Sequence, residues 1–232
     1  MLSRARYLEA MGIDVWRRRA AGREHQTAAS VGDANAVPVV TRMSWEELRR
    51  SVAECTRCEL HRGRTQTVFG VGHPRAEWLV IGEAPGAEED RQGEPFVGRA
   101  GQLLTAMLLA VGLKREQVFI ANILKCRPPN NRDPQPEEIN CCAPFLERQI
   151  ALVAPRIILA VGRIAGQNLL KTGTPIGRLR GQAYAYGERR IPLVVTYHPA
   201  YLLRSPREKR KVWQDLLFAR RLYRKSMRET PA

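Results

Sequence analysis

Short apolar runs alternate with stretches of helical periodicity along the middle of the chain. Four runs are predominantly apolar and predict buried strands over residues 77–82, 117–122, 156–161 and 191–196. Apolar residues recur at helical spacing in 101–111, 136–152, 164–170 and 207–228. Strands that alternate with helices predict a parallel sheet covered by helices on both faces. The predicted fold class is therefore α/β, a three-layer α/β/α arrangement with a central, mainly parallel four-stranded sheet.

The first 42 residues differ in pattern from the rest. Ser44 is followed by Glu47 at the spacing of a capping box, so we expect the folded domain to begin near residue 43. Before it, residues 4–19 form an amphipathic pattern whose apolar positions are Leu8, Met11, Ile13 and Trp16. The sequence therefore predicts two parts: an amphipathic segment and flexible linker over 1–42, and one domain over 43–232.

The composition excludes several classes of protein. The chain of 232 residues has 38 Lys and Arg against 23 Asp and Glu, a net charge of +15, and is 44% hydrophobic. That hydrophobic content is too high for a disordered basic tail. No apolar run approaches the ~20 residues of a membrane span, and the N-terminus lacks a signal-peptide core. We therefore expect a cytoplasmic protein that binds no membrane, with a polyanion, nucleic acid first, as its partner.

Three of the four predicted strands end in polar or glycine-rich segments. Gly-Glu-Ala-Pro-Gly (82–86) follows the first strand, Asn122 ends the second, and His198 comes shortly after the fourth. Open α/β sheets bind ligands at the carboxyl ends of their strands. We therefore expect these three segments to converge on one cleft.

Five cysteines need a different explanation from disulfide bonds. A reducing compartment and a chain long enough to bury a core make a disulfide framework unnecessary. The cysteines form a C-x2-C pair and a later group, Cys55 and Cys58, then Cys126, Cys141 and Cys142. Four thiolates gathered near basic residues suit a tetrahedral zinc site or an iron–sulfur cluster. The spacing leaves zinc and iron both open.

Taken together, the motifs resemble a known family. They are Cys-x2-Cys at 55–58, GEAPG at 82–86, EPFVGRAGQLL at 94–104, NILKCRPPNNR at 122–132 and HPAYLLR at 198–204. In this order they resemble the family 4 uracil-DNA glycosylases, the iron–sulfur branch of that superfamily, from about Cys55 to about Arg204. The resemblance implies a [4Fe–4S] cluster held by Cys55, Cys58, Cys126 and Cys142, with Cys141 as the spare.

The resemblance also implies roles in excising uracil from DNA and leaving an abasic site. His198 would donate a hydrogen bond to the base oxygen on which charge develops, and Glu83 would orient the attacking water. Other branches carry an acid at Ala84, so here the acid would be Glu83 or a neighbour such as Glu89. The candidates for substrate binding are Ala84, Glu89, Phe96 for stacking, and Asn122 and Asn131 for amide recognition. The candidates for DNA binding are Leu202, as the wedge that enters the vacated stack, and Arg204 for phosphates.

The ends of the chain suggest further partners. Residues 205–232 carry nine Lys and Arg against three acidic residues, which predicts a salt-sensitive attraction to DNA. Residues 4–19 loosely resemble the peptide by which the psi subunit of a bacterial clamp loader binds its partner, so we expect docking on a replication or repair protein. Relatives that trap DNA covalently carry a histidine shortly after the third cysteine, but residues 127–134 contain none, so we expect catalytic turnover instead of covalent trapping. We expect the protein to act as a monomer. The alternative is a non-catalytic DNA-binding adaptor with a structural metal–thiolate site, recruited through the N-terminal tail.

Overall fold

The computed structural model describes residues 40–229, in which six strands form one sheet in the order β1-β3-β2-β4-β6-β5. The four central strands are parallel, and the two outer ones are antiparallel to their neighbours. The strands are β1 (Val71–Gly72), β2 (Trp78–Gly82), β3 (Phe119–Asn122), β4 (Ile157–Val161), β5 (Ala183–Tyr186) and β6 (Ile191–Thr196). The predicted α/β class and its four parallel strands are confirmed.

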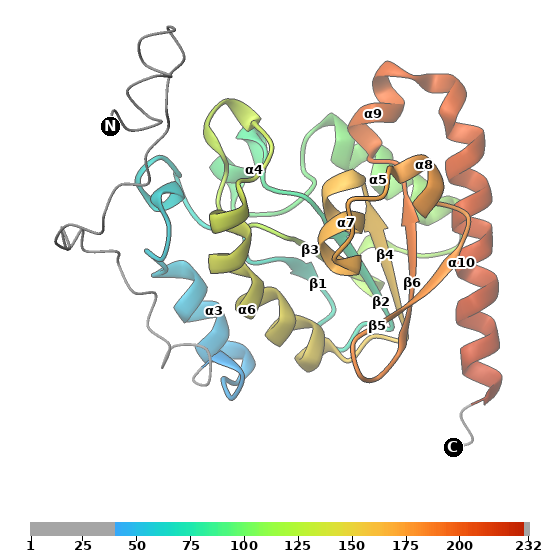
Figure 1. Cartoon of the computed structure of the whole chain (residues 1–232), viewed down its shortest axis with the longest axis horizontal. Helices are drawn as coiled ribbons and strands as arrows, with labels where there is room; N and C mark the ends of the chain where they lie inside the picture. Colours follow the sequence, from blue (N-terminus) through green and yellow to red (C-terminus); the bar gives the residue numbers. More distant parts are fainter. Residues whose placement is uncertain (1–39, 230–232) are drawn as a thin grey trace, which may run out of the picture. The chain divides into compact units, whose positions relative to one another are not determined.

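Helices cover both faces of this sheet, as the alternation of side chains along the strands requires. Leu79 and Ile81 of β2 face a core shared with α3 (Trp45–Ala53), α6 (Pro136–Val153) and α7 (Arg163–Leu170). Trp78 and Val80 face a second core shared with α5 (Arg99–Ala110), α9 (Pro199–Arg204) and α10 (Lys209–Glu229). Figure 1 shows α10 on the opposite side of the sheet from α3 and α6. The three predicted layers are present.

Local sequence signals fix where several helices begin and end. The Ser44 hydroxyl accepts a hydrogen bond from the Glu47 N–H, and the Glu47 carboxylate accepts one from the Ser44 N–H, so the predicted capping box starts α3. α6 has Pro136 in its first turn and Glu137 and Glu138 near its positive end. α5 stops just before Gly112, whose φ of 81° suits glycine. The remaining short helices include α4 (Ala87–Gln92) and α8 (Ile176–Leu179).

The sheet is wider than the predicted four strands. The extra strands both lie at edges: β1 has two residues, too few for any periodic signal, and β5 alternates exposed and half-buried residues with none fully buried. The predicted N-terminal segment with Leu8, Met11, Ile13 and Trp16 lies outside the described residues. Within residues 40–229, no helix is both long and apolar enough to cross a membrane.

Candidate active site

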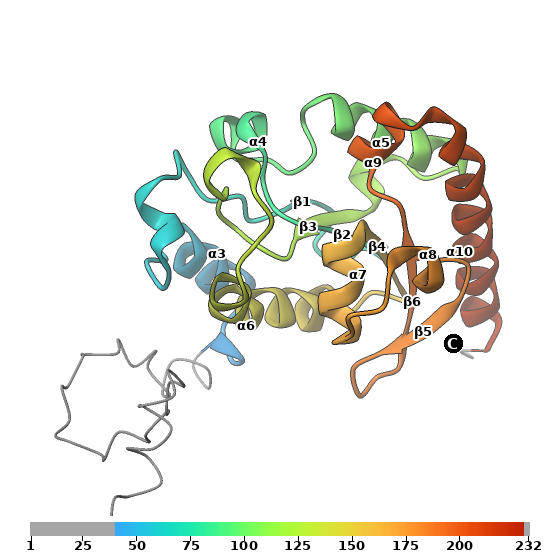
Figure 2. The same ribbon diagram turned by 45° about the horizontal axis from the view of Figure 1, so that its top comes forward.

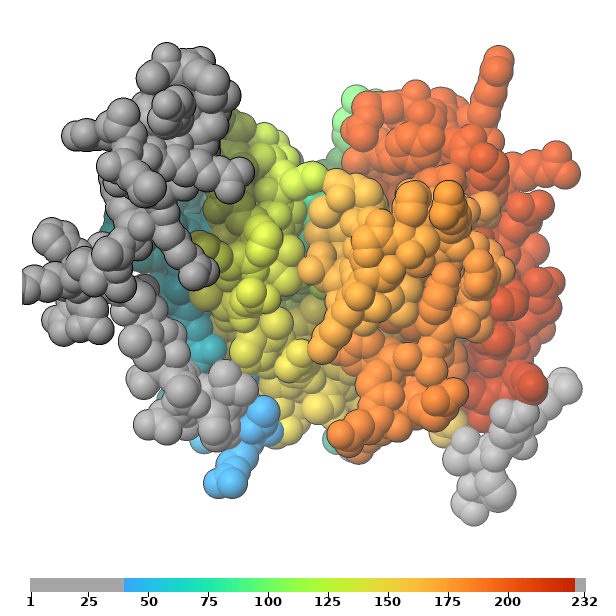
Figure 3. Space-filling model, in the orientation of Figure 1, coloured from blue at the N-terminus to red at the C-terminus, as the bar shows by residue number. Residues whose placement is uncertain are grey.

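A pocket of about 480 Å³ lies at the carboxyl ends of the parallel strands. Figure 2 brings this edge forward, with α4, α9 and the loop after β3 around it. In the space-filling view the surface is hollowed between the yellow-green segment after β3 and the orange-red α9 (Figure 3). The convergence of three strand ends is confirmed. The pocket is lined by Glu83, Ala84, Pro85, Gly86, Glu89, Phe96, Ala100, Asn122, Pro128, Asn131, Arg132, His198, Ala200, Tyr201 and Arg204.

The amide of Asn122 and the ring of Phe96 meet above Gly82. A Cβ on Gly82 would lie 2.5 Å from Asn122 Oδ1 and 2.5 Å from Phe96 Cζ, so only glycine leaves room for both. Gly82 and Asn122 are register partners in β2 and β3. Asn122 is 2% exposed, and its Oδ1 has no hydrogen-bond partner in the described part of the chain. A buried oxygen of this kind is costly unless a ligand satisfies it.

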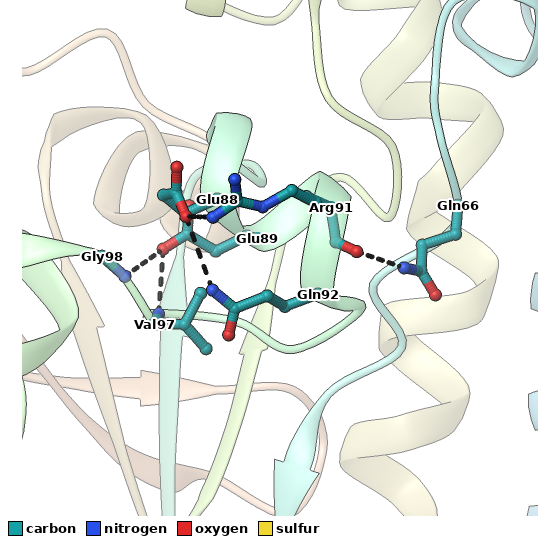
Figure 4. Close-up of polar contacts among 7 residues, drawn as sticks. All are labelled: Gln66, Glu88, Glu89, Arg91, Gln92, Val97 and Gly98. Atoms are coloured by element: carbon teal, nitrogen blue, oxygen red, sulfur yellow. Dashed lines mark hydrogen bonds and ion pairs between the residues drawn. The ribbon is translucent and has the colours of Figure 1, made fainter.

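Glu89 joins two loops that border the pocket. Its Oε2 accepts the Gly86 N–H at 3.2 Å, and its Oε1 accepts the Val97 and Gly98 N–H groups at 2.9 and 3.1 Å. Figure 4 shows the carboxylate of Glu89 reaching Val97 and Gly98 from α4. Gly86 and Gly98 are the N-caps of α4 and α5, so one carboxylate serves the positive ends of two helices. Both of its oxygens are therefore occupied by the protein backbone.

This connection holds Phe96 in an unusual backbone conformation. Phe96 has a φ of 56° and is 7% exposed. A non-glycine residue with positive φ costs roughly 1–3 kcal/mol and persists only where its surroundings impose it. Those surroundings are the Glu89 hydrogen bonds to the next two residues and the close approach of Gly101, where a Cβ would lie 1.7 Å from the Phe96 carbonyl oxygen. The Phe96 ring lies 5.6 Å from the His198 ring, between centroids.

His198 is held as a neutral ring with a defined tautomer. Its Nδ1 accepts the Ala200 N–H at 3.1 Å, which places the proton of the neutral ring on Nε2. Burial, and to a smaller extent the charge of Arg204, lower the pKa of His198 to about 4, against an opposing effect of Glu89. The backbone of Gly162, with a φ of 104°, leaves room for the ring, because a Cβ there would lie 3.2 Å from His198 Cβ. At neutral pH this side chain is a hydrogen-bond donor without charge.

The strand that leads to His198 is anchored to α10. Thr196, the last residue of β6, donates its hydroxyl to Asp215 Oδ2 at 2.8 Å. Asp215 is 1% exposed and also accepts two hydrogen bonds from Arg180, at 3.0 and 2.9 Å. Arg180 in turn lies over the Tyr197 ring, 5.4 Å from its centroid. The buried ion pair between Arg180 and Asp215 thus anchors the end of β6, from which the loop with His198 continues.

Glu83 is a carboxyl group with a strongly perturbed pKa. It follows β2 directly, and its backbone carbonyl accepts the Leu124 N–H at 3.0 Å, which ties its loop to the segment after β3. Burial and the nearby negative charge of Asp133 raise the pKa of Glu83 to about 7, against an opposing effect of Arg163. A carboxyl group with a pKa near neutrality, in a pocket, is suited to move or orient a proton.

The cysteines gather from three segments of the chain beside this pocket. Cys126 and Cys142 are buried together with Leu60 and Leu124, and Cys58 and Ala84 pack against them. Burial, with a smaller effect of neighbouring thiols, raises the pKa of Cys58 to about 11 and that of Cys142 to about 12, against opposing backbone hydrogen bonds. Arg64 donates to Cys126 Sγ at 3.1 Å. In the described chain, no three His, Cys, Asp or Glu side chains are grouped so as to hold a metal ion.

Cys141 differs from Cys142 in its surroundings. Cys141 is only partly buried, and its thiol contacts the Arg57 carbonyl oxygen at 3.3 Å. Cys142 is 4% exposed and lies within the buried thiol group. The choice of Cys142 as ligand stays a prediction, and this difference in burial is in its favour.

Leu202 does not occupy the position that a DNA wedge requires. It is 1% exposed and packs in the core cluster between the sheet and α5, α9 and α10. In this conformation it cannot enter a duplex, because the turn of α9 points it inward. The exposed side chains beside it are Tyr201 and Leu203, at 37% and 39%.

Other predicted residues lie at the rim of the pocket. Asn131 is exposed, and its Oδ1 accepts a hydrogen bond from Arg127 at 2.8 Å, which leaves its NH2 group as the available donor. Arg204 and Ala84 also line the pocket. Tyr201 and Arg132 also line the pocket, and their places in the motifs at 198–204 and 122–132 are the sequence signal for them, although neither was predicted as a site residue.

Comparison with known proteins identifies related sequences. A family model described as the uracil DNA glycosylase superfamily matches residues 69–217. A type-4 uracil-DNA glycosylase of Archaeoglobus fulgidus is 44% identical over 178 residues, covering 74% of this chain and 89% of that protein. Type-4 uracil-DNA glycosylases of Sulfurisphaera tokodaii and Thermotoga maritima are 44% and 45% identical, covering 77% and 69% of this chain and 84% and 85% of those proteins.

Proposed function

This chain belongs to the type-4 branch of the uracil-DNA glycosylase superfamily, and we propose that the pocket at the strand ends is where it excises uracil from DNA. The carrying observation is that one pocket holds an unsatisfied buried amide oxygen, a neutral histidine donor and a carboxyl group with a raised pKa. These three groups match the needs of base recognition, leaving-group stabilisation and water activation. Groups with shifted pKa values that converge in one pocket favour a catalytic site over a non-catalytic adaptor.

Asn122 and Phe96 would select the base. The Asn122 oxygen accepts the N3–H of uracil, while its NH2 group donates to the O4 oxygen. Cytosine presents an amino group where uracil has O4, so two donors would face each other and one buried polar group would stay unpaired. Phe96 would stack on the flipped base, in the place that its strained backbone fixes.

His198 would stabilise the departing base. Cleavage of the bond between the sugar C1′ and the base N1 leaves the electron pair on uracil, whose negative charge spreads onto its two carbonyl oxygens. The Nε2–H of His198 can donate to such an oxygen without itself losing a proton, since its pKa of about 4 keeps it neutral. Removal of one such donor typically reduces kcat by about 10²–10³-fold.

Glu83 would act on the water and on the sugar. As a carboxylate it accepts a proton from the water whose oxygen forms the new bond to C1′, and its charge stabilises the oxocarbenium-like sugar. Glu89 would serve as a positioning residue, because both its oxygens already accept backbone N–H groups.

A [4Fe–4S] cluster would be held by Cys55, Cys58, Cys126 and Cys142. The residue types suit this group, because they are sulfur ligands in a largely apolar setting with the Arg64 guanidinium at Cys126, although no three of them in the described residues stand close enough to share one metal ion. When bound, the cluster would supply a cross-link between the three segments rather than a redox step, since glycosidic hydrolysis moves no electrons. Anaerobic purification should give iron-loaded protein with visible absorption, and a colourless protein with bound zinc would refute this assignment.

Contacts with DNA would come from the pocket rim and from α10. The pocket is bordered by Tyr201 and Arg204, and Leu203 is exposed beside them. The helix α10 carries many basic residues. DNA affinity should therefore fall steeply with salt, while preference for uracil should not. A monomeric state, and docking on a replication or repair protein through residues 4–19, complete the proposal.

One assay tests the central assignment. The purified protein is incubated with a uracil-containing oligonucleotide, and abasic sites are then cleaved with alkali. His198→Ala should lose about 10²–10³-fold in kcat, whereas His73→Ala, which changes an exposed histidine far from the pocket, should keep wild-type activity. Undiminished excision by His198→Ala would exclude this pocket as the site of chemistry.

A further inference from the structure

Tyr201 is an exposed aromatic side chain at the rim of the candidate active site. It is 37% exposed, yet it lines the same pocket as Phe96 and His198. It belongs to α9, which borders the hollow in the space-filling view (Figure 3). Arg204 follows three residues later on the same face of this helix and also lines the pocket. The rim therefore offers a flat apolar ring beside a cation, which suits contact with the base and the phosphate of a nucleotide.

The ring of Tyr201 is packed against a supported neighbour. Its centroid lies 5.1 Å from that of the Tyr197 ring, at an interplanar angle of 52°. Arg180 lies over the other aromatic ring of this pair, 5.4 Å from its centroid, and is itself held by the buried carboxylate of Asp215. The Tyr201 N–H donates to the His198 carbonyl oxygen at 2.9 Å. Because the ring is ordered before DNA binds, little conformational entropy is lost when it contacts DNA.

The two leucines that follow Tyr201 are less suited to contact bases at this pocket. Leu202 is buried, and turning it outward would leave a cavity in the core between the sheet and α5. Leu203 is exposed, but the described residues that line the pocket do not include it. Of these three consecutive residues, Tyr201 is the one that is both exposed and part of the pocket lining.

We propose that Tyr201 is the side chain that enters the base stack of duplex DNA at the place vacated by the flipped uracil. This inference rests on the proposed excision of uracil in this pocket. Extrusion of a base leaves a gap and costs the stacking and pairing energy of that base. The Tyr201 ring replaces part of this energy by stacking on the bases that border the gap, and so keeps uracil in the pocket. Tyr201 thus binds DNA and takes no part in the cleavage of the glycosidic bond.

The test measures uracil excision by the full-length protein on one oligonucleotide, single-stranded and paired with its complement. Tyr201→Ala should lower the ratio of kcat/KM on duplex to kcat/KM on single-stranded DNA by about 5–150-fold, the effect of losing one stacked base. A single strand has no complementary strand to leave a gap in, so it depends less on the ring. Tyr201→Phe keeps the ring and should recover most of the ratio. Leu109→Ala, which shortens an exposed side chain on α5, should keep the wild-type ratio.

A second readout compares uracil paired with adenine and uracil mismatched with guanine. A mismatched base costs less to extrude than a paired one. Tyr201→Ala should therefore lose more kcat/KM on the adenine duplex than on the guanine duplex. A variant that is only destabilised would lose the same factor on every substrate.

A further variant keeps the inference testable if Tyr201→Ala does not fold. Tyr201→Gln keeps an extended side chain beside Tyr197 but lacks the aromatic ring, so the same fall in the duplex ratio is expected. Wild type that releases no uracil from either form of DNA would overturn the proposed function, and this inference with it. Active wild type together with a wild-type ratio in the folded Tyr201 variants, or with equal losses on the adenine and guanine duplexes, would overturn this inference alone.

Discussion

The role of Glu89 can be tested by changing one oxygen of its carboxylate. In Glu89→Gln one acceptor becomes an NH2 group, which cannot accept the N–H it faces. If the amide oxygen of the Glu89→Gln variant still accepts the Val97 and Gly98 N–H groups, the hydrogen bond from the Gly86 N–H is lost. The two remaining hydrogen bonds then go to a neutral amide and no longer to a charged carboxylate. Hydrogen bonds to charged groups contribute about 1.5–3 kcal/mol each and neutral ones about 0.5–1.5 kcal/mol. Allowing for partial exposure, we expect the variant to be destabilised by about 2–4 kcal/mol.

The effect on activity should arise through Phe96. When the next two residues are released, Phe96 can leave its backbone conformation with φ of 56°, a strain of about 1–3 kcal/mol. The stacking surface is then no longer fixed, and kcat/KM should fall by about 5–150-fold. Hydrogen exchange should show lost protection at the Gly86, Val97 and Gly98 amides.

The matched control is the neighbouring glutamate. Glu88 is exposed and forms an ion pair with Arg91 on the surface of α4, so Glu88→Gln should change stability by less than about 1 kcal/mol. Thermal unfolding should place Glu89→Gln about 5–15 °C below wild type for a domain of this size. The reasoning would be refuted by a Glu89→Gln variant that melts with wild type yet loses kcat, since Glu89 would then be acting on the substrate.

With a pKa of about 7, Glu83 gains its carboxylate form as the pH rises, so the excision rate should increase between pH 5 and 8, and a flat profile would contradict its role. The folded-state pKa of Glu83 lies above its unfolded value of 4.5, so its stabilising contribution is complete below pH 4.5 and lost by about pH 7; Glu83→Gln should melt higher than wild type at pH 8 but not at pH 4.5. Thr196→Val removes the hydroxyl that donates to Asp215 and should lower kcat more than it changes KM, while Thr196→Ser keeps the bond and wild-type kinetics; steady-state values that do not distinguish the two variants would count against this anchor. Leu202→Ala should lower the free energy of unfolding by about 2–5 kcal/mol in denaturant titration, whereas Leu203→Ala should change it by less than about 0.5 kcal/mol; the opposite order would mean that Leu202 is a surface residue.

The parallel part of the fold could be predicted because its strands are buried on both faces. β2 and β4 are continuous apolar runs, and such runs have a clear signal in the sequence. The edge strands were missed for the opposite reason. β5 is half exposed, and β1 is defined only by its pairing with β3, which depends on contacts distant in sequence.

The meeting of Asn122 and His198 in one pocket could be predicted, because both follow parallel strands whose carboxyl ends share one edge of the sheet. Their roles stay predictions. The inward position of Leu202 could not be predicted, because the face of α9 that packs on α5 is decided by the tertiary structure. The burial of Lys125 against the Asn122 backbone could not be predicted either, because it depends on the packing of the end of β3 against Gln149 of α6.

Gly82 determines how the specificity of this pocket can change. The Asn122 amide and the Phe96 ring pack directly against the backbone of Gly82. This part of the pocket therefore has no side chain that a substitution could shorten. Any larger residue at Gly82 collides with both groups at once, and mutation at this position can therefore only close the pocket. A pocket that accepts a bulkier or differently substituted base must come from changes in its walls, at Asn122 or Phe96. The evolutionary and engineering routes to new base specificity in this enzyme are correspondingly few.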